Sequence, residues 1–320
     1  MIWHALGVIP HDWNDDDIPD QTGRTVLVTG ANSGLGLCSA LALARHGATV
    51  VLGCRSPERG AQALAQVTAA ATGSTPTLLA VDLADLSSIE VAASRLSGSI
   101  EHLDVLMNNA GVMALPLRRT ADGFEAQFGT NHLGHFALTG RLLPLLSAAP
   151  APRVVTTSST MHKIGKMRWD DLNWANGYRK WPAYGQSKLA NLLFAFELDR
   201  RARAHGSALV SVAAHPGYAS THLQAAGPEM AGNNLMKRAT DVANRLVAQP
   251  AEMGALPQLC AATLPGIEGG SYLGPDRFFE SAGHPKIVRG TKSAYREDEA
   301  ERLWAVSEDL TGVTFEWPPA

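Results

Sequence analysis

The stretch Thr25-Val26-Leu27-Val28-Thr29-Gly30-Ala31-Asn32-Ser33-Gly34-Leu35-Gly36 decides the fold of this chain. An apolar β-branched run leads through a glycine-rich turn into the helix-like residues 37–46, which is the strand, turn and helix order of a phosphate-binding loop. Gly30 allows the tight turn, Gly34 lets the backbone approach a phosphate, and Gly36 permits close helix packing. The spacing is GxxxGxG and not the common GxGxxG, so a purely structural glycine turn is the alternative here.

A second signature, Tyr184-Gly185-Gln186-Ser187-Lys188, lies past the middle of the chain. Residues four apart share one face of a helix, so both side chains can enter one pocket. An ammonium about 4 Å from a phenol favours the phenolate by roughly 4 kcal/mol at an effective dielectric of ~20, or about three pKa units, and desolvation opposes this. The alternative is a Tyr and a Lys on a surface face. Together with the glycine loop, the pair predicts a nicotinamide-dependent oxidoreductase.

Composition narrows the class of protein. The 320 residues, 45% of them hydrophobic, suit one large α/β domain with appendages. A formal net charge of −3 and a pI near 6.4 give no electrostatic case for a nucleic-acid partner. Cys38, Cys54 and Cys260 have unrelated spacings, which indicates buried thiols in a reducing compartment and neither a disulfide framework nor a zinc site. Residues 1–10 fall short of the ~20 apolar residues of a membrane span, so we expect a soluble cytoplasmic protein.

Short β-branched runs alternate with alanine- and leucine-rich helical patterns along the chain, as in a parallel sheet covered on both faces. Strands are expected at residues 25–29, 48–53, 77–81, 103–107, 153–157, 208–213 and 270–273. Helices are expected at residues 35–46, 57–72, 86–97, 121–147, 183–205, 251–263 and 296–310. The pattern predicts a single Rossmann-type, doubly wound parallel sheet of about seven strands. Residues 1–22 are expected to form a leader, 23–275 the domain, and 276–320 an extension packed on it.

Polar or glycine-bearing turns follow three of these strands directly. They are Asn108-Asn109-Ala110-Gly111, Ser158-Ser159 and His215-Pro216-Gly217. Ligands of such sheets bind at the carboxyl ends of the strands, so we expect these turns to carry the chemistry.

The elements TGxxxGxG, NNAG, Ser, YxxxK and PG, in this order, resemble the short-chain dehydrogenase/reductase family over about residues 23–275. Within it, the runs 130–136 and 187–194 are similar to the retinol-dehydrogenase and WW-domain-oxidoreductase branch. No WW domain precedes the fold and no membrane anchor is found, so membrane retinoid metabolism is not expected of this chain.

The resemblance implies a role for each site residue. Ser159, with Ser158 as the alternative, would hydrogen-bond the substrate oxygen, Tyr184 would exchange its proton, and Asn131 would support a water near Lys188. Lys188 would also hold the nicotinamide ribose. The implied cofactor-binding residues are Gly30, Asn32, Ser33, Gly34, Leu35, Gly36, Arg55, Asp82, Leu83, Asn109, Ala110, Gly111, Tyr184, Lys188, Pro216, Gly217 and Thr221. A helix-capping role is the alternative for Asp82.

The end of the second strand, Leu52-Gly53-Cys54-Arg55-Ser56, lacks the acidic residue that binds the ribose of NAD. Arg55 suits the 2′-phosphate of NADP, so NADP(H) is favoured over NAD(H), with an ordinary solvated arginine as the alternative. The histidines show no metal spacing, and His132 and His135, which flank Gly134 in the family-like run, fit a packing or hydrogen-bonding role as well as a functional one. No metal is expected.

We predict an NADP(H)-dependent enzyme that interconverts an apolar carbonyl compound with its alcohol. The loops 113–116, 161–164 and 220–231 are poor in charge, with Lys163, His222 and Glu229 as exceptions. One alternative is an epimerase or dehydratase, disfavoured because those relatives usually carry TGxxGxxG. Another is a cofactor-sensing scaffold without catalysis, disfavoured because the Tyr and Lys are intact. A homodimer through helices 121–147 and 183–205 is expected by analogy.

Overall fold

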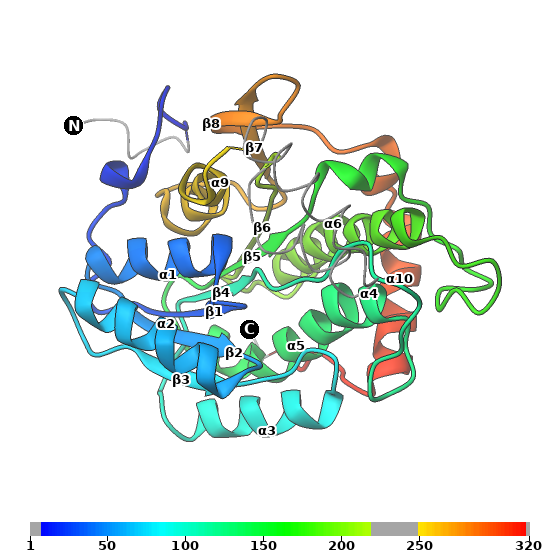
Figure 1. The fold of residues 1–320 in the computed structure, drawn as a ribbon, viewed down its shortest axis with the longest axis horizontal. Coiled ribbons are helices and arrows are strands. Elements are labelled where there is room, and N and C mark those ends of the chain that lie inside the picture. The colour runs from blue at the N-terminus through cyan, green and yellow to red at the C-terminus, as the bar shows by residue number, and fades with distance from the viewer. Residues whose placement is uncertain (1–7, 219–248, 318–320) are drawn as a thin grey trace, which may run out of the picture.

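The computed structural model describes residues 8–218 and 249–317. Its described strands form one sheet in the order β3-β2-β1-β4-β5-β6-β7-β8 (Figure 1). Their bounds are Thr25–Thr29 (β1), Thr49–Cys54 (β2), Thr77–Ala80 (β3), Val105–Asn108 (β4), Arg153–Thr157 (β5), Val210–Ala214 (β6), Tyr272–Arg277 (β7) and Ala282–Ile287 (β8). All neighbours pair in parallel except β7 and β8, which are antiparallel.

The strand order reverses beside β1, which pairs with β2 on one side and with β4 on the other. The chain runs outward from β1 through β2 to β3 and then returns to β4 on the other side of β1. The connections that follow β1 and β4 therefore leave two neighbouring strands in opposite directions at the carboxyl edge of the sheet. Ligands of doubly wound sheets bind at such a switch point. The glycine loop follows β1 and the NNAG turn follows β4, so the topology brings these two motifs together.

Helices cover both faces of the sheet (Figure 1). Side chains alternate along a strand, and Val26 and Val28 of β1 accordingly pack in one core cluster while Leu27 packs in another. The first cluster includes α1 (Gly34–Arg45), α2 (Pro57–Ala70) and α9 (Ala251–Thr263). The second includes α3 (Leu86–Ser97), α5 (Gly134–Ser147) and α6 (Lys180–Ala204). The three-layer architecture predicted from the sequence is confirmed.

Two details differ from the sequence-based expectation, which the sheet otherwise follows. An eighth strand, β8, pairs antiparallel at the edge of the sheet. Its sequence hides it because Gly283 and Pro285 interrupt any strand pattern, and an edge strand tolerates proline. The helix expected at 121–147 is also interrupted: a short α4 (Ala126–Phe128) and a π-helical turn, η3 (Gly129–Leu133), precede α5.

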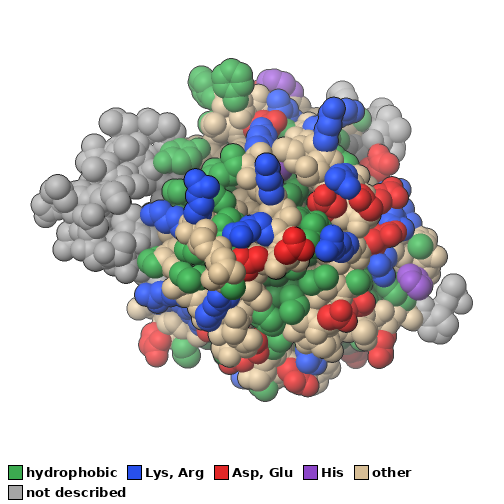
Figure 2. All heavy atoms as spheres, turned by 90° about the vertical axis from the view of Figure 1, so that its right-hand side faces the viewer, with side chains coloured by type: hydrophobic (Ala, Val, Ile, Leu, Met, Phe, Trp, Pro, Cys, Tyr) green, Lys and Arg blue, Asp and Glu red, His purple; other side chains and the backbone are tan. Residues whose placement is uncertain are grey.

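The last helix, α10 (Glu297–Thr311), lies outside α6 and packs against it (Figure 1). Trp304 of α10 and Phe315 beyond it pack on Phe136 of α5, with ring centroids 5.1 and 5.0 Å away, and Trp304 also stacks on Phe194 of α6. These residues cover the helix pair through which we expected a dimer. On the side of the molecule that Figure 2 presents, acidic and basic side chains are interspersed.

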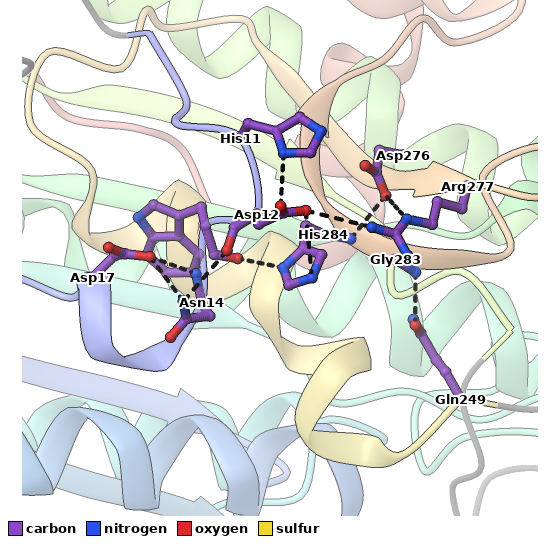
Figure 3. A network of polar contacts seen from close by, with 10 residues as sticks. His11, Asp12, Asn14, Asp17, Gln249, Asp276, Arg277, Gly283 and His284 are labelled. Atoms are coloured by element: carbon purple, nitrogen blue, oxygen red, sulfur yellow. Dashed lines mark hydrogen bonds and ion pairs between the residues drawn. The ribbon is translucent and has the colours of Figure 1, made fainter.

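The start of the described chain is fastened to the β7–β8 hairpin (Figure 3). Trp13 is buried, and its carbonyl oxygen accepts a hydrogen bond from His284 Nδ1 at 3.0 Å. His11, Asp12 and Asp276 lie close enough together to suggest a cation site. However, the Arg277 guanidinium pairs with Asp12 at 3.4 Å and with Asp276 at 3.8 Å, so the cluster already has a counter-ion.

Candidate active site

The glycine loop is folded tightly onto the end of β2 and the start of α1. Gly30 and Gly34 have left-handed backbones, with φ of 67° and 52°, and the Gly30 N–H donates to Gly53 O at 2.8 Å. A Cβ on Gly36 would overlap the Gly30 carbonyl oxygen and lie 2.6 Å from Asn109 Nδ2. Residues with side chains at these positions would fill the turn.

The beginning of α1 fits a phosphate group. Its first turn has no acidic residue, and within the described structure the side chain of its N-cap, Ser33, makes no capping hydrogen bond. The first N–H groups of a helix lack partners inside the helix, and the helix dipole favours negative charge there. Asn32, Ser33, Gly34 and Leu35 are half-buried around this point. The loop therefore suits the pyrophosphate of a dinucleotide.

Thr29 joins the glycine loop to the turn after β4. Its Oγ1 accepts the backbone N–H groups of Asn109 and Ala110 at 2.9 and 3.0 Å, and Asn109 Nδ2 donates to the Thr29 carbonyl at 2.7 Å. His135 Nε2 lies 2.9 Å from the same hydroxyl. Gln258 of α9 donates to Asn109 Oδ1 at 3.0 Å. Asn109 thus positions the loop, which the sequence analysis did not foresee.

Tyr184 and Lys188 lie one helical turn apart on α6, and both are buried, 4% and 3% exposed. Tyr184 shares a side-chain hydrogen bond with Ser159, which follows β5. Lys188 Nζ donates to the Thr157 carbonyl at 3.0 Å and lies 5.8 Å from the centre of the Tyr184 ring. The structure therefore brings Ser159, Tyr184 and Lys188 together, as the motif predicts.

The electrostatics differ from the expectation of a phenol tuned towards neutrality. Burial raises the pKa of Tyr184 to about 12, although the hydrogen bond with Ser159 acts in the opposite direction. Burial also lowers the pKa of Lys188 to about 8. The expected fall of about three pKa units is wrong for this structure, because it counted an ammonium about 4 Å away and left out desolvation, which dominates for this buried phenol.

Ser158 is excluded as the serine that faces the substrate. Its Oγ donates to the Lys188 carbonyl at 2.8 Å inside the core, and the residue is 1% exposed. Ser159 instead caps the short 3₁₀ helix η4 (Thr160–Ile164), accepting the Met161 N–H at 3.2 Å. The Ser159 hydroxyl is thereby held at the carboxyl edge of the sheet, beside Tyr184.

Asn131 lies in the π-helical turn η3, a type of helix irregularity that often marks functional sites. Its side chain accepts the Val112 N–H at 2.7 Å and donates to the Val112 carbonyl and to Ser187 Oγ, both at 2.9 Å. A Cβ on Gly111 would lie 3.2 Å from Asn131 Oδ1 and 3.5 Å from Lys188 Nζ. Asn131 therefore fixes the NNAG turn beside Lys188, and its water-binding role stays a prediction.

The other expected cofactor residues are placed unevenly. Arg55 is exposed just beyond β2, whose Gly53 holds the glycine loop. Asp82 accepts the Ala84 N–H at 3.0 Å, while Asp85 caps α3, so the capping alternative for Asp82 is not realised. Leu83 is buried in the core.

Pro216 and Gly217 follow β6, and a Cβ on Gly217 would overlap the Ser281 carbonyl. Thr221, His222 and Glu229 lie outside the described residues.

Sequence reasoning missed two residues that organise the site, Thr29 and Gln258, and it gave His135 only as a packing or hydrogen-bonding candidate. His135 donates through Nδ1 to the Asn131 carbonyl at 3.0 Å, and burial lowers its pKa to about 4, so it is neutral. It sits inside the family-like run 130–136, which was a usable signal. Gln258 links Ser39, Thr157 and Asn109 from a distant helix, and nothing in its local sequence indicates this.

None of the helices in residues 8–218 and 249–317 is both long and apolar enough to cross a membrane.

Comparison with known proteins identifies the family of this chain. A family model described as short chain dehydrogenase matches residues 24–231. Retinol dehydrogenase 14 from Homo sapiens is 37% identical over 304 residues, covering 91% of this chain and 87% of that protein. Retinol dehydrogenase 13 from Homo sapiens is 38% identical over 294 residues, with 91% and 85% covered.

Two solved structures share the fold. An uncharacterised protein from Mycobacterium paratuberculosis is 41% identical, with a TM-score of 0.77 and coverage of 96% of this chain and 100% of that one. A short chain dehydrogenase from Shigella flexneri, solved in complex with NADP, is 24% identical, with a TM-score of 0.60 and coverage of 79% and 97%.

Proposed function

The chain belongs to the short-chain dehydrogenase family, in its retinol-dehydrogenase-like branch, and is an oxidoreductase of alcohols and carbonyls; from that premise we propose that it uses NADP(H) to interconvert a fairly apolar aldehyde or ketone with its alcohol. The observation that carries the proposal is the hydrogen bond between buried Tyr184 and half-buried Ser159, with buried Lys188 one turn along the same helix.

Tyr184 is the proton donor in the direction of reduction. With a pKa of about 12 its phenol is fully protonated near neutral pH, so the donor form is always present. Ser159 holds the substrate oxygen beside that phenol. NADPH, when bound, would supply the hydride for the carbonyl carbon. The positive charge of Lys188 stabilises the phenolate that remains after proton transfer.

The backbone of residues 30–36 would hold the pyrophosphate at the start of α1. Arg55 would contact the 2′-phosphate of NADP, since it is exposed directly beyond the strand that anchors the glycine loop. Lys188 would hold the nicotinamide ribose, and Pro216 and Gly217 would lie against the ring. The free thiols of Cys38, Cys54 and Cys260 support a reducing, cytoplasmic location.

Two observations favour an apolar substrate. The loop after β4 is fixed with apolar Ala114 and Leu115: Gln127 Oε1 accepts the Ala114 N–H at 2.7 Å, and Tyr178 donates to the Leu115 carbonyl at 2.8 Å. Lys163, the cation that could have bound a carboxylate, is already paired with Glu280 at 3.1 Å. Relatives named for retinol, an apolar alcohol, agree with this choice.

A panel of carbonyl compounds, followed through the absorbance of reduced nicotinamide, tests the proposal. We expect kcat/KM to rise along a series of straight-chain aldehydes by up to about fourfold per methylene, equivalent to ~0.8 kcal/mol, until the pocket is full. NADPH should support faster turnover than NADH. A flat series, or a preference for short carbonyls that bear a carboxylate, would contradict the assignment.

A further inference from the structure

The turn between β7 and β8 has an unusual backbone. Phe278, Phe279 and Glu280 are consecutive non-glycine residues with left-handed φ values of 49°, 54° and 66°. Such conformations are strained for residues with a Cβ and persist where the surrounding structure fixes them, often at functional sites. The two phenylalanines are 76% and 99% exposed, so their side chains do not hold the turn. The side chain of the third residue, Glu280, is the one that contacts the rest of the protein.

Glu280 points back towards the protein, with its side chain 20% exposed. Its Oε2 accepts a hydrogen bond from Lys163 Nζ at 3.1 Å and lies 3.5 Å from His215 Nε2. Lys163 follows β5 and His215 follows β6. One carboxylate therefore joins three separate segments at the carboxyl edge of the sheet.

The contact between Glu280 and His215 leads to the loop that is expected to contact the nicotinamide. His215 is fully buried, and its Nδ1 accepts the Gly217 N–H at 3.2 Å, so the ring proton sits on Nε2 and faces Glu280. Within the described structure this buried nitrogen makes no hydrogen bond, and the Glu280 carboxylate at 3.5 Å is the acidic group that faces it. A Cβ on Gly274 would collide with it, so this glycine leaves room for the imidazole.

The contact between Glu280 and Lys163 leads to Ser159, the serine of the catalytic group. Lys163 belongs to η4, the short helix that Ser159 caps. In the same helix His162 donates through Nδ1 to the Ser159 carbonyl at 2.7 Å and accepts the Thr291 N–H through Nε2 at 3.2 Å. Fixing Lys163 therefore limits how far Ser159 can move relative to Tyr184.

We propose that Glu280 is a positioning residue for the reaction: it fixes the Ser159 helix through Lys163 and the Pro216-Gly217 loop through His215. The inference rests on the proposed function. It also gives the strained turn a role, because this turn brings a carboxylate from the edge hairpin back to both loops. The interactions with His215 and Lys163 lower the pKa of this carboxyl group to about 2, so it is charged near neutral pH.

The test separates the two connections. In Glu280→Gln we expect kcat for aldehyde reduction to fall about tenfold or more and the Kd for NADPH, measured by its fluorescence, to rise several-fold. Lys163→Gln should lower kcat while the Kd for NADPH stays within about twofold of wild type. The double variant should be no slower than Glu280→Gln alone, because both changes break one interaction.

Two further variants guard against a general loss of structure. Glu280→Asp keeps the charge and should recover part of the lost kcat. Glu90→Gln breaks the surface pair with Arg141, which spans 3.4 Å, and should leave kcat and Kd unchanged. If Glu280→Gln does not fold, the comparison of Glu280→Asp and Lys163→Gln with wild type replaces it, with both expected to slow kcat.

Wild-type kcat and Kd in Glu280→Gln, or additive effects in the double variant, would overturn the inference. A wild-type enzyme that binds NADPH but reduces no carbonyl compound would instead contradict the proposed function, and the Kd change in Glu280→Gln would still test the connection through His215.

Discussion

Replacing Lys188 with methionine should stabilise the folded protein while abolishing its chemistry. Burial lowers the pKa of Lys188 from 10.5 to about 8, which means that the folded state holds the charged form at a cost. At about 1.4 kcal/mol per pKa unit, this cost is about 3 kcal/mol near neutral pH. Methionine fills a similar volume without a charge. The Thr157 carbonyl loses Lys188 but keeps its hydrogen bond from Asn191 Nδ2 at 2.9 Å, so the net gain should be about 2 kcal/mol.

The gain must depend on pH in a defined direction. Below pH ~8 the lysine is protonated in both the folded and the unfolded state, and the full cost is present. Between pH ~8 and ~10.5 the unfolded state binds more protons than the folded state, so wild-type stability rises with pH. Above that window neither state is charged. The advantage of Lys188→Met should therefore shrink steadily as the pH rises through the window.

Urea unfolding of wild type and Lys188→Met at a series of pH values measures this directly. Lys166→Met, at an exposed position, is the matched control and should change the free energy of unfolding little. A variant less stable than wild type near neutral pH would refute the reasoning, and so would a stability difference that does not change with pH.

Three other substitutions test the site. Tyr184→Phe should lower kcat by about 10²- to 10⁴-fold with NADPH affinity nearly kept, and stopped-flow reduction that retains a tenth of the wild-type rate would exclude Tyr184 as the acid. Arg55→Ala should weaken NADPH binding by about 1.5–3 kcal/mol in titration calorimetry and spare NADH; equal losses would mean no 2′-phosphate contact. Gly36→Ala places a Cβ against Gly30 and Asn109 and should abolish nucleotide-induced stabilisation in thermal melts; an unchanged shift would show that the loop can widen.

Local patterns predicted the local features well. The apolar run of β1 is buried along its length and the glycine turn needs specific backbone angles, so both leave marks in consecutive residues. The Tyr184 and Lys188 pair could be predicted equally well, because helical spacing alone places the two side chains on one face. In contrast, β8 carries Gly283 and Pro285, and its pairing with β7 becomes evident only in three dimensions.

The sequence could not predict how deeply a side chain is buried or which residues far apart in the chain come into contact. The pKa of Tyr184 moves upward because the phenol is buried, and burial is a property of the completed fold. Glu280 and His215 belong to different strand ends, and their short motifs contain nothing that points from one to the other. Nothing in the sequence indicated that the Asn109 side chain hydrogen-bonds the Thr29 carbonyl, and its predicted cofactor contact stays a prediction.

The cover that α10 and Phe315 place over α5 and α6 has a consequence for how the protein is made. These residues follow both helices in the sequence, so they are synthesised after them. Until then the aromatic side chains of Phe136 and Phe194 lack Trp304 and Phe315, which shield them in the finished molecule. Exposed apolar surface of this kind makes a nascent chain prone to association. Completion of this part of the core must therefore wait until α10 and Phe315 have been synthesised, and termination before them would leave an aggregation-prone fragment.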